Sequence, residues 1–163
     1  MASVVFKKKG LPMANYISAD NVFLHCPAAT RDELLEFVAE KAVEQGVATD
    51  KNALVQAFLD REATESCGLV SGVAVPHAKC ASVTRPCVMV VRSDNELDWE
   101  TMDHTPVRCA VAIMVPDTDA GTPYLRLLAK AAVMLMDDGF VARVRALDDP
   151  AEVAAAVNQG LGA

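Results

Sequence analysis

Residues 67–79 read CGLVSGVAVPHAK, a run of small and β-branched residues that closes on a Pro-His pair. The two glycines predict a turn, and the apolar residues after them predict a short strand. Pro76 has no N–H to donate to a ladder, so we expect the strand to stop there and to leave His77 at the rim of a sheet. An imidazole in that position can be a nucleophile near pH 7, because its neutral form is well populated.

Three apolar runs predict the other strands of this sheet. Residues 22–24 form a short run that predicts an edge strand. Residues 87–91 and 107–115 are longer runs without polar alternation, and Pro116 stops the second of them. Continuous apolar runs of this length are typical of strands that are buried on both faces of a sheet.

Capping signals predict two helices before residue 67. Thr30 and Glu33 have the spacing of a capping box, and Gly46 stands where a helix favours a left-handed residue after its end. Asp50 can cap a second helix, which leads into Arg61 and Glu62. The expected apolar faces are Leu34, Leu35, Val38, Ala39, Ala42 and Val43 on the first helix, and Leu54, Val55, Phe58 and Leu59 on the second.

Three more helices are predicted after the last strand. Residues 117–121 read as a loop, and Thr122-Pro123 is a helix start, since Pro is favoured at the first helical position. Residues 140–147 predict a short helix, and Asp149-Pro150 opens the last one. The expected apolar faces are Leu125, Leu128, Ala132 and Leu135 on the first of the three, and Val153 and Val157 on the last.

Helices before and after a central sheet predict a layered α/β domain. The 163 residues, of which 52% are apolar, suit one domain with one core. We expect a three-layer α/β/α sandwich with a mixed central β-sheet and helices on both faces. Residues 1–13, which contain a run of three lysines, are expected to be a flexible tail, and residues 14–163 to form the domain.

Charge and composition exclude several classes of function. The net charge of −7 argues against nucleic acid as a partner, because phosphate backbones demand a basic face. Insertion into a membrane is not expected, because no stretch reaches the ~20 consecutive apolar residues of a membrane span. The five cysteines are an odd number without a CxxC pair, which favours buried free thiols in a reducing compartment over a disulfide framework. We therefore expect a cytoplasmic protein.

Only three histidines are available for chemistry. His104 lies in a polar segment before a strand, where it is expected to be a solvated turn residue. His25 follows an apolar run and precedes a proline, so a structural role is expected for it. His77 and Cys80 have H-x2-C spacing, which can begin a zinc site, but no second matching pair exists and no metal is expected.

A longer pattern surrounds His77. Residues 61–68 read REATESCG, and residues 73–79 read VAVPHAK. This pattern resembles the signature of the type 2 class of phosphotransferase system (PTS) EIIA domains, the fructose, mannitol and nitrogen-regulatory class. In that class an Arg-Glu pair, a Ser-Thr-Gly turn and an apolar strand lead into a Pro-His dipeptide. The similarity covers roughly residues 14–159, with a specific motif around His77 and agreement in pattern elsewhere.

The resemblance implies a role for each matching residue. His77 matches the phosphorylated histidine, and Arg61 matches an arginine that can neutralise phosphoryl oxygens. A helix-end residue bonded to carbonyls is the alternative for Arg61. Glu62 is expected to orient Arg61 or to cap the chain locally. Ser66 and Ser71 can offer hydroxyls or backbone N–H groups to the phosphoryl group, or serve in ordinary turns.

The chain departs from the class at three positions. Tyr124 stands where members usually carry a second histidine, Cys67 replaces the threonine of the turn, and Ser71 replaces an asparagine. A tyrosine hydroxyl can still donate a hydrogen bond to the phosphoryl group, although it carries no charge at neutral pH. The free N–H groups at the helix start near Tyr124 can also favour an anion.

The resemblance implies reversible phosphoryl transfer through a phosphohistidine, without a metal or an organic cofactor. The implied donor is an HPr/NPr-type phosphocarrier protein, and the implied acceptors are an EIIB domain in sugar uptake or regulatory target proteins. A shallow apolar ring of Leu69, Val70 and Ala78 is expected around His77 for docking. The missing second histidine favours an alternative, a non-transferring regulatory or binding module with the EIIA fold.

Overall fold

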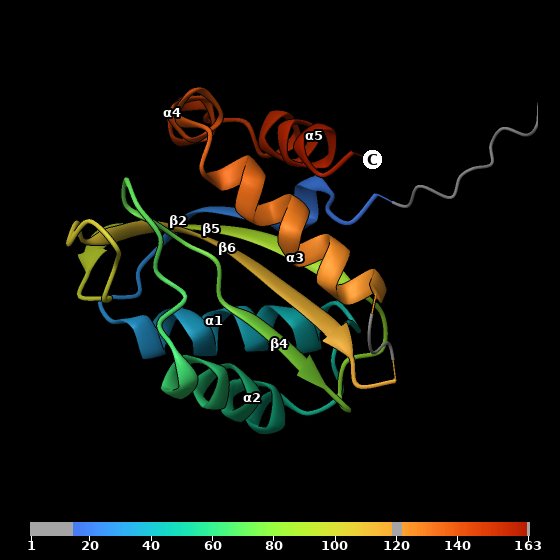
Figure 1. The fold of residues 1–163 in the computed structure, drawn as a ribbon. Helices are drawn as coiled ribbons and strands as arrows, with labels where there is room; N and C mark the ends of the chain where they lie inside the picture. Colours follow the sequence, from blue (N-terminus) through green and yellow to red (C-terminus); the bar gives the residue numbers. More distant parts are fainter. Residues whose placement is uncertain (1–14, 119–121, 163) are drawn as a thin grey trace, which may run out of the picture.

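The computed structural model describes residues 15–118 and 122–162 of the chain. In it a mixed sheet of five strands lies between two layers of helices (Figure 1). The expected three-layer α/β/α sandwich is therefore confirmed. The tail expected over residues 1–13 lies outside the described residues.

The sheet has the strand order β2-β5-β6-β3, and β4 continues along β6 beyond β3. β5 runs antiparallel to β6, whereas β2 is parallel to β5, and β3 and β4 are parallel to β6. The short run at residues 22–24 is an edge strand, as predicted. The strands are β2 (Val22–Cys26), β3 (Val73–Ala74), β4 (His77–Cys80), β5 (Cys87–Leu97) and β6 (Val107–Pro116).

The strand before Pro76 stops as expected, because β3 ends at Ala74, but the chain leaves the sheet only briefly, which was not expected. It rejoins the sheet at His77 as β4, and His77 pairs in register with Ile113 of β6. The Pro76 carbonyl accepts a hydrogen bond from the Ile113 N–H at 2.9 Å. Proline is compatible with this path because β3 and β4 form an edge of the sheet, where an absent N–H costs no ladder bond.

Two helices cover one face of the sheet: α1 (Arg31–Glu44) and α2 (Lys51–Thr64). Thr30 and Asp50 cap them as predicted, each accepting a hydrogen bond from the N–H three residues later. Gly46 follows α1 with a φ of 74°, the left-handed conformation expected of it. These local signals fix where each helix begins and where α1 ends.

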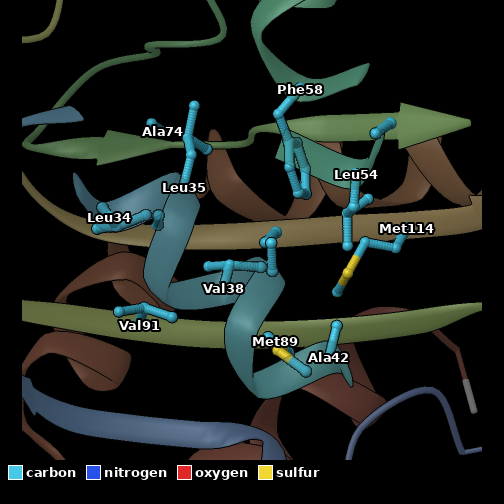
Figure 2. Close-up of a cluster of buried hydrophobic side chains, with 14 of the residues drawn as sticks. Leu34, Leu35, Val38, Ala42, Leu54, Phe58, Ala74, Met89, Val91 and Met114 are labelled. Carbon is cyan, nitrogen blue, oxygen red and sulfur yellow. The ribbon is translucent and has the colours of Figure 1, made fainter. Parts of the chain in front are cut away.

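The core beneath α1 and α2 is built from the predicted faces of both helices and one face of the sheet (Figure 2). Val43 is the exception: it was predicted on the buried face of α1, but it is exposed. Leu34, Leu35 and Val38 of α1 and Leu54 and Phe58 of α2 are buried completely or nearly so. Side chains from β3, β5 and β6 meet them: Ala74, Met89, Val91, Ala112 and Met114. Aliphatic packing of this kind places the C-terminal end of α2 against β4.

Three helices cover the other face: α3 (Thr122–Leu135), α4 (Asp138–Ala146) and α5 (Pro150–Gly160). Asp149 caps α5 as predicted, and the predicted buried face of Val153 and Val157 is confirmed. The predicted face of α3 is partly wrong, because Leu125 and Ala132 are exposed. Its buried residues are Leu127, Ala131, Met134 and Leu135.

Candidate functional site

His77 lies where β4 begins, at the level of the last residues of β6. The end of α2 packs against β4 on one side. The first turn of α3 approaches on the other, where the Tyr124 ring centroid lies 6.5 Å from that of His77. His77 is partly buried, so its ring is neither sealed in the core nor fully in solvent. The site is thus a junction of the sheet edge and two helix ends.

The two ring nitrogens of His77 have different partners. Nδ1 lies 2.9 Å from the carbonyl oxygen of Val75, which can only accept, so Nδ1 carries the hydrogen. Nε2 then presents its lone pair and accepts a hydrogen bond from the Arg61 Nε–H at 3.0 Å. This arrangement selects one tautomer and makes Nε2 the nucleophilic nitrogen of the ring.

The surroundings of His77 keep the ring neutral. Burial lowers the pKa of His77 below its ordinary value of 6.5, and the positive charge of Arg61 lowers it further. The Val75 carbonyl and the Glu62 carboxylate oppose this shift. At pH 7 the imidazole is therefore uncharged and Nε2 is free of a proton.

Arg61 belongs to the last turn of α2, and it has both of the roles considered for it. Its Nη1 donates to the carbonyl oxygen of Glu65 at 2.8 Å, as a helix-end residue does. Its Nε reaches His77 at the same time. In the described part of the chain, no carboxylate lies within ion-pair distance of Arg61. Its charge is therefore directed at the histidine rather than neutralised by an acid.

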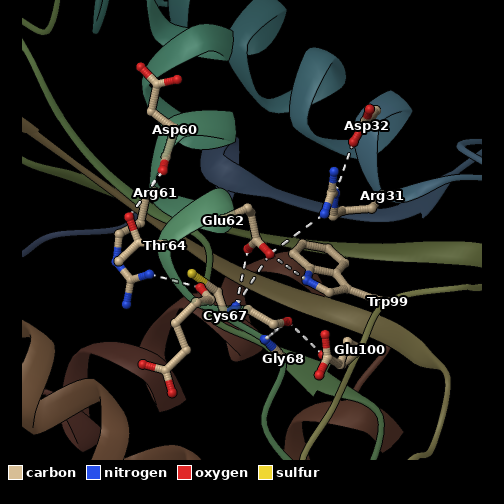
Figure 3. Close-up of polar contacts among 12 residues, drawn as sticks. Arg31, Asp32, Asp60, Arg61, Glu62, Thr64, Cys67, Gly68, Trp99 and Glu100 are labelled. Carbon is tan, nitrogen blue, oxygen red and sulfur yellow. Dashed lines mark hydrogen bonds and ion pairs between the residues drawn. The ribbon is translucent and has the colours of Figure 1, made fainter.

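Glu62 does not orient Arg61, which corrects one of the two expected roles. Figure 3 shows the two side chains leaving α2 on different sides. The Glu62 carboxylate is buried and accepts hydrogen bonds from the Cys67 N–H at 3.3 Å and from the Trp99 indole N–H at 3.2 Å. Glu62 thus anchors the turn after α2 and acts beneath the site, not in it.

The turn at residues 65–68 is held by its own side chains. Ser66 Oγ donates to the Glu100 carbonyl at 2.6 Å and accepts the Gly68 N–H at 3.1 Å. Cys67 Sγ lies 3.7 Å from Nδ1 of His77. Burial raises the pKa of Cys67 to about 12, so its thiol stays neutral beside the imidazole. The hydroxyl of Ser66 is engaged in the turn, and Cys67 supplies a neutral wall of the site.

The structure does not bring Ser71 to His77. Ser71 has a left-handed backbone with a φ of 59°, and its N–H donates to the Asp103 carboxylate at 2.9 Å. Its carbonyl oxygen accepts from Arg145. The next residue bonds to β6 at Arg108, five residues before the level of His77. Ser71 is therefore a turn residue near the start of β6, whereas His77 lies toward the end of β6.

Tyr124 stands beside the histidine, as the resemblance implied, and a cation lies next to it. The ammonium of Lys79 is 5.8 Å from the centroid of the Tyr124 ring. Lys79 was absent from the predicted site, because ending the strand at Pro76 gave no reason to place it beside His77. Alternation along β4, residue by residue, is the signal that finds it.

The remaining expectations are settled by burial and strand geometry. Cys80 lies three residues after His77 on one strand, so the two side chains take opposite faces, and Cys80 packs in the core with α1 and α2. His25 is exposed near Asp94, and His104 is an exposed turn residue. Ala78 is buried, whereas Leu69 and Val70 are half-buried, so the expected apolar ring around His77 is wrong for Ala78.

Comparison with known proteins gives the family. Residues 15–160 match the family described as "Phosphoenolpyruvate-dependent sugar phosphotransferase system, EIIA 2". The chain belongs to this EIIA family. A relative in Haloferax volcanii, the PTS system fructose-specific EIIA component, is 32% identical over 117 residues, which are 72% of this chain and 75% of the relative.

Two solved structures share the fold of this EIIA domain. Nitrogen regulatory protein IIA-Ntr from Neisseria meningitidis superposes with a TM-score of 0.79 at 20% identity, over 87% of this chain and 96% of that one. Enzyme IIAMTL of Escherichia coli, solved in a complex with phosphorylated enzyme IIBMTL, gives 0.66 at 22% identity, over 90% and 96% of the two chains. None of the helices in residues 15–118 and 122–162 is long and apolar enough to cross a membrane.

Proposed function

We propose that this EIIA domain is a phosphohistidine carrier that accepts a phosphoryl group on Nε2 of His77. The observation that carries the proposal is the pair of hydrogen bonds on the imidazole. The Val75 carbonyl holds the proton on Nδ1, so the lone pair is on Nε2, and Nε2 is the nitrogen that contacts the Arg61 guanidinium. A nucleophile and a charge-stabilising group at one atom are what phosphoryl transfer requires.

The transfer step needs no change in the protonation of His77. The Nε2 lone pair forms the new N–P bond, and the N–P bond to the donor histidine breaks, returning its electron pair to the donor ring. The proton stays on Nδ1 throughout, hydrogen-bonded to the Val75 carbonyl oxygen. Arg61 must release Nε2 before the attack, since its Nε–H bond occupies the reacting lone pair. The freed guanidinium can then bind the phosphoryl oxygens.

We assign the donor to the HPr/NPr-type phosphocarriers and the acceptor to an EIIB domain or to regulatory targets. Support comes from the family, from the fructose-specific relative and from the structural neighbour solved with phosphorylated enzyme IIBMTL. Because the chain also resembles IIA-Ntr, transfer can serve either nitrogen-type regulation or sugar uptake. The five buried free cysteines support a cytoplasmic location for this reaction.

The test is phosphorylation in a reconstituted system. The protein is incubated with phosphoenolpyruvate, enzyme I and an HPr-type carrier, and the product is measured by intact mass. We expect an increase of ~80 Da, the mass of one phosphoryl group, that is stable in base and labile in acid. His77→Ala must remove it, and 31P NMR must assign the group to Nε2.

His25→Ala and His104→Ala are the matched controls, because both histidines are exposed and lie outside the site. Both variants should be labelled like the wild type. Label that persists in His77→Ala contradicts the assignment of the nucleophile. A wild-type protein that stays unlabelled supports the second candidate, a binding module without transfer, which the replacement of a histidine by Tyr124 favours.

A further inference from the structure

We propose that Lys79 is a second phosphoryl-binding cation of this site, held in place by the aromatic face of Tyr124. The inference rests on the proposed phosphorylation of His77 and extends it. It assigns to Lys79 the positive charge that Arg61 alone does not supply on the α3 side of the imidazole.

The strand geometry of β4 places Lys79 on the same face as His77. Ala78 and Cys80 are buried in the core with α1 and α2, so the alternating residues His77 and Lys79 point away from that core. Residues two apart on a strand are about 6.6 Å apart along it, within the reach of a lysine side chain. Lys79 can therefore serve a group that is attached to the His77 ring.

Tyr124 connects the two side chains. Its ring centroid lies 6.5 Å from that of His77 and 5.8 Å from the ammonium of Lys79. The face of an aromatic ring carries negative charge density and attracts an ammonium within about 6 Å of its centroid. Tyr124 is half-buried and lies in the first turn of α3, where it packs against the buried cluster on that side of the sheet. The tyrosine thus restricts Lys79 to the side of His77 that faces α3.

The charges around His77 point to an anion. The chain carries a net charge of −7, yet Arg61, which contacts the imidazole, and Lys79, which contacts the neighbouring Tyr124 ring, have no carboxylate within ion-pair distance among residues 15–118 and 122–162. Arg61 comes from α2 and Lys79 from β4, so they approach His77 from different elements. A phosphoryl group on Nε2 would meet a planar guanidinium on one side and a compact ammonium on the other.

This arrangement also accounts for the departure at residue 124. The resemblance implies a second histidine there, which can carry a charge, and a tyrosine at neutral pH cannot. Burial raises the pKa of Tyr124 further, so the phenol stays neutral. The Lys79 ammonium on the Tyr124 ring restores a positive charge at this place. The charge that a histidine would carry on its own ring is then supplied by a lysine bound to the tyrosine ring.

The experiment compares Lys79→Gln with Lys79→Arg in the reconstituted phosphorylation system. For Lys79→Gln we expect a loss of about tenfold in the rate of labelling or in the lifetime of the phosphohistidine, the effect of one charge-assisted hydrogen bond. Lys79→Arg should stay within about twofold of the wild type, because the charge is kept. The rate should also depend less on salt in Lys79→Gln than in the wild type.

Further variants separate a charge effect from damage to the fold. Lys51→Gln removes a half-buried lysine that pairs with Glu36 at the far end of α2, and it should leave labelling unchanged. Tyr124→Phe keeps the ring and should retain the contribution of Lys79. Tyr124→Leu removes the ring, so adding Lys79→Gln to it should cause little further loss. Thermal unfolding of each variant must match the wild type for its rate to be interpreted.

The failure of this inference differs from the failure of the proposed function. If the wild type is labelled on His77 and Lys79→Gln is labelled at the same rate with the same lifetime, the role of Lys79 is wrong and the carrier function stands. If Lys79→Arg loses as much as Lys79→Gln, charge is not the cause and the inference is overturned. If the wild type takes up no label, both are overturned.

Discussion

At the scale of single residues, the reactivity of His77 depends on what its neighbours do to its two nitrogens. The Val75 carbonyl decides which nitrogen holds the proton, and Arg61 decides what the other one meets. Neither effect requires an acid beside the ring, because Glu62 is turned toward Trp99 and Cys67. One carbonyl and one guanidinium therefore set the tautomer and the hydrogen bonds of the imidazole.

The pKa of His77 gives a prediction at this scale. Burial and the charge of Arg61 lower it below 6.5, so labelling should persist as the pH falls below 6.5. In NMR titrations Arg61→Gln should raise this pKa, because one of the two lowering causes is removed. Arg143→Gln, a change of an exposed arginine on α4, is the control and should leave it unchanged. An unchanged pKa in Arg61→Gln would contradict the observed contact.

The same shift has a consequence for stability, and its sign follows from proton binding. Below pH 6.5 the unfolded chain protonates His77 before the folded chain does, so the unfolded state binds more protons. The free energy of unfolding should therefore fall as the pH decreases from 6.5 toward the lower pKa of the folded state. Urea unfolding across this range should show a steeper pH dependence of the free energy of unfolding for the wild type than for His77→Gln. Above about pH 7.5 the two proteins should have the same pH dependence.

At the scale of elements, the turn after α2 connects the helix to the site through a close backbone approach. Gly68 packs so tightly on the Glu100 carbonyl that a Cβ would overlap it, and Thr101 Cγ2 would be only 2.9 Å away. Gly46, after α1, has open space around the position of a Cβ but a φ of 74°. The two glycines are needed for different reasons, one steric and one conformational.

A matched pair of substitutions separates these reasons. Gly46→Ala should cost about 1–2 kcal/mol of stability from its left-handed backbone and leave phosphorylation of His77 unchanged. Gly68→Ala must displace the turn that holds Cys67 against the His77 ring, so it should lower both the stability and the rate of labelling. Urea unfolding and the reconstituted assay measure the two effects. Equal labelling in both variants would show that this turn does not position the site.

The sequence predicted the elements well where a local signal exists and poorly where the tertiary structure decides. The caps Thr30, Asp50 and Asp149 each marked a helix start, because one side chain and one N–H are enough to make a cap. The buried face of α3 was mispredicted because its own leucine, alanine and methionine residues are spread around the whole helix. Several helical stripes therefore fit the apolar pattern equally.

The candidate site was predictable for a similar reason only in part. The motif around His77 and Arg61 was informative because both lie on one compact supersecondary unit. The prediction for Ser71 was wrong because an extended chain separates residues 71 and 77 in space, although they are close in sequence. β4, and with it Lys79, was missed because proline was taken to end a strand. It cannot be known from the sequence that this strand lies at an edge, where proline is tolerated.

At the scale of the whole molecule, one arginine joins the sheet to the helices of the α3–α5 layer. Arg92 of β5 is largely buried, and its Nη1 donates to the carbonyl oxygens of Val144, Arg145 and Leu147 where α4 ends. Its Nη2 contacts Asp148 at 3.0 Å. A cation at a helix C-terminus satisfies free carbonyls and the dipole together, so Arg92 fixes how α4 sits on the sheet.

Arg92→Leu should destabilise the molecule by about 2–3 kcal/mol, because several charge-assisted hydrogen bonds are lost at once. Arg108→Leu is the control: this arginine of β6 pairs with Glu96 in an exposed position, where such pairs contribute about 0–1 kcal/mol. Urea unfolding gives both values, and hydrogen exchange in α4 should increase only for Arg92→Leu. Similar losses in the two variants would refute the anchoring role.

β3 and β4 follow each other along β6 and form one edge of the sheet, and this edge has a consequence for solubility. Within the described residues β4 pairs with β6 alone, so its outer backbone is a template on which a strand of another molecule could add. Proline and lysine on a short border strand are the means by which soluble proteins prevent such self-association. Pro76 and Lys79 thus protect this edge against aggregation, which lets the imidazole of His77 lie there without recruiting neighbouring chains.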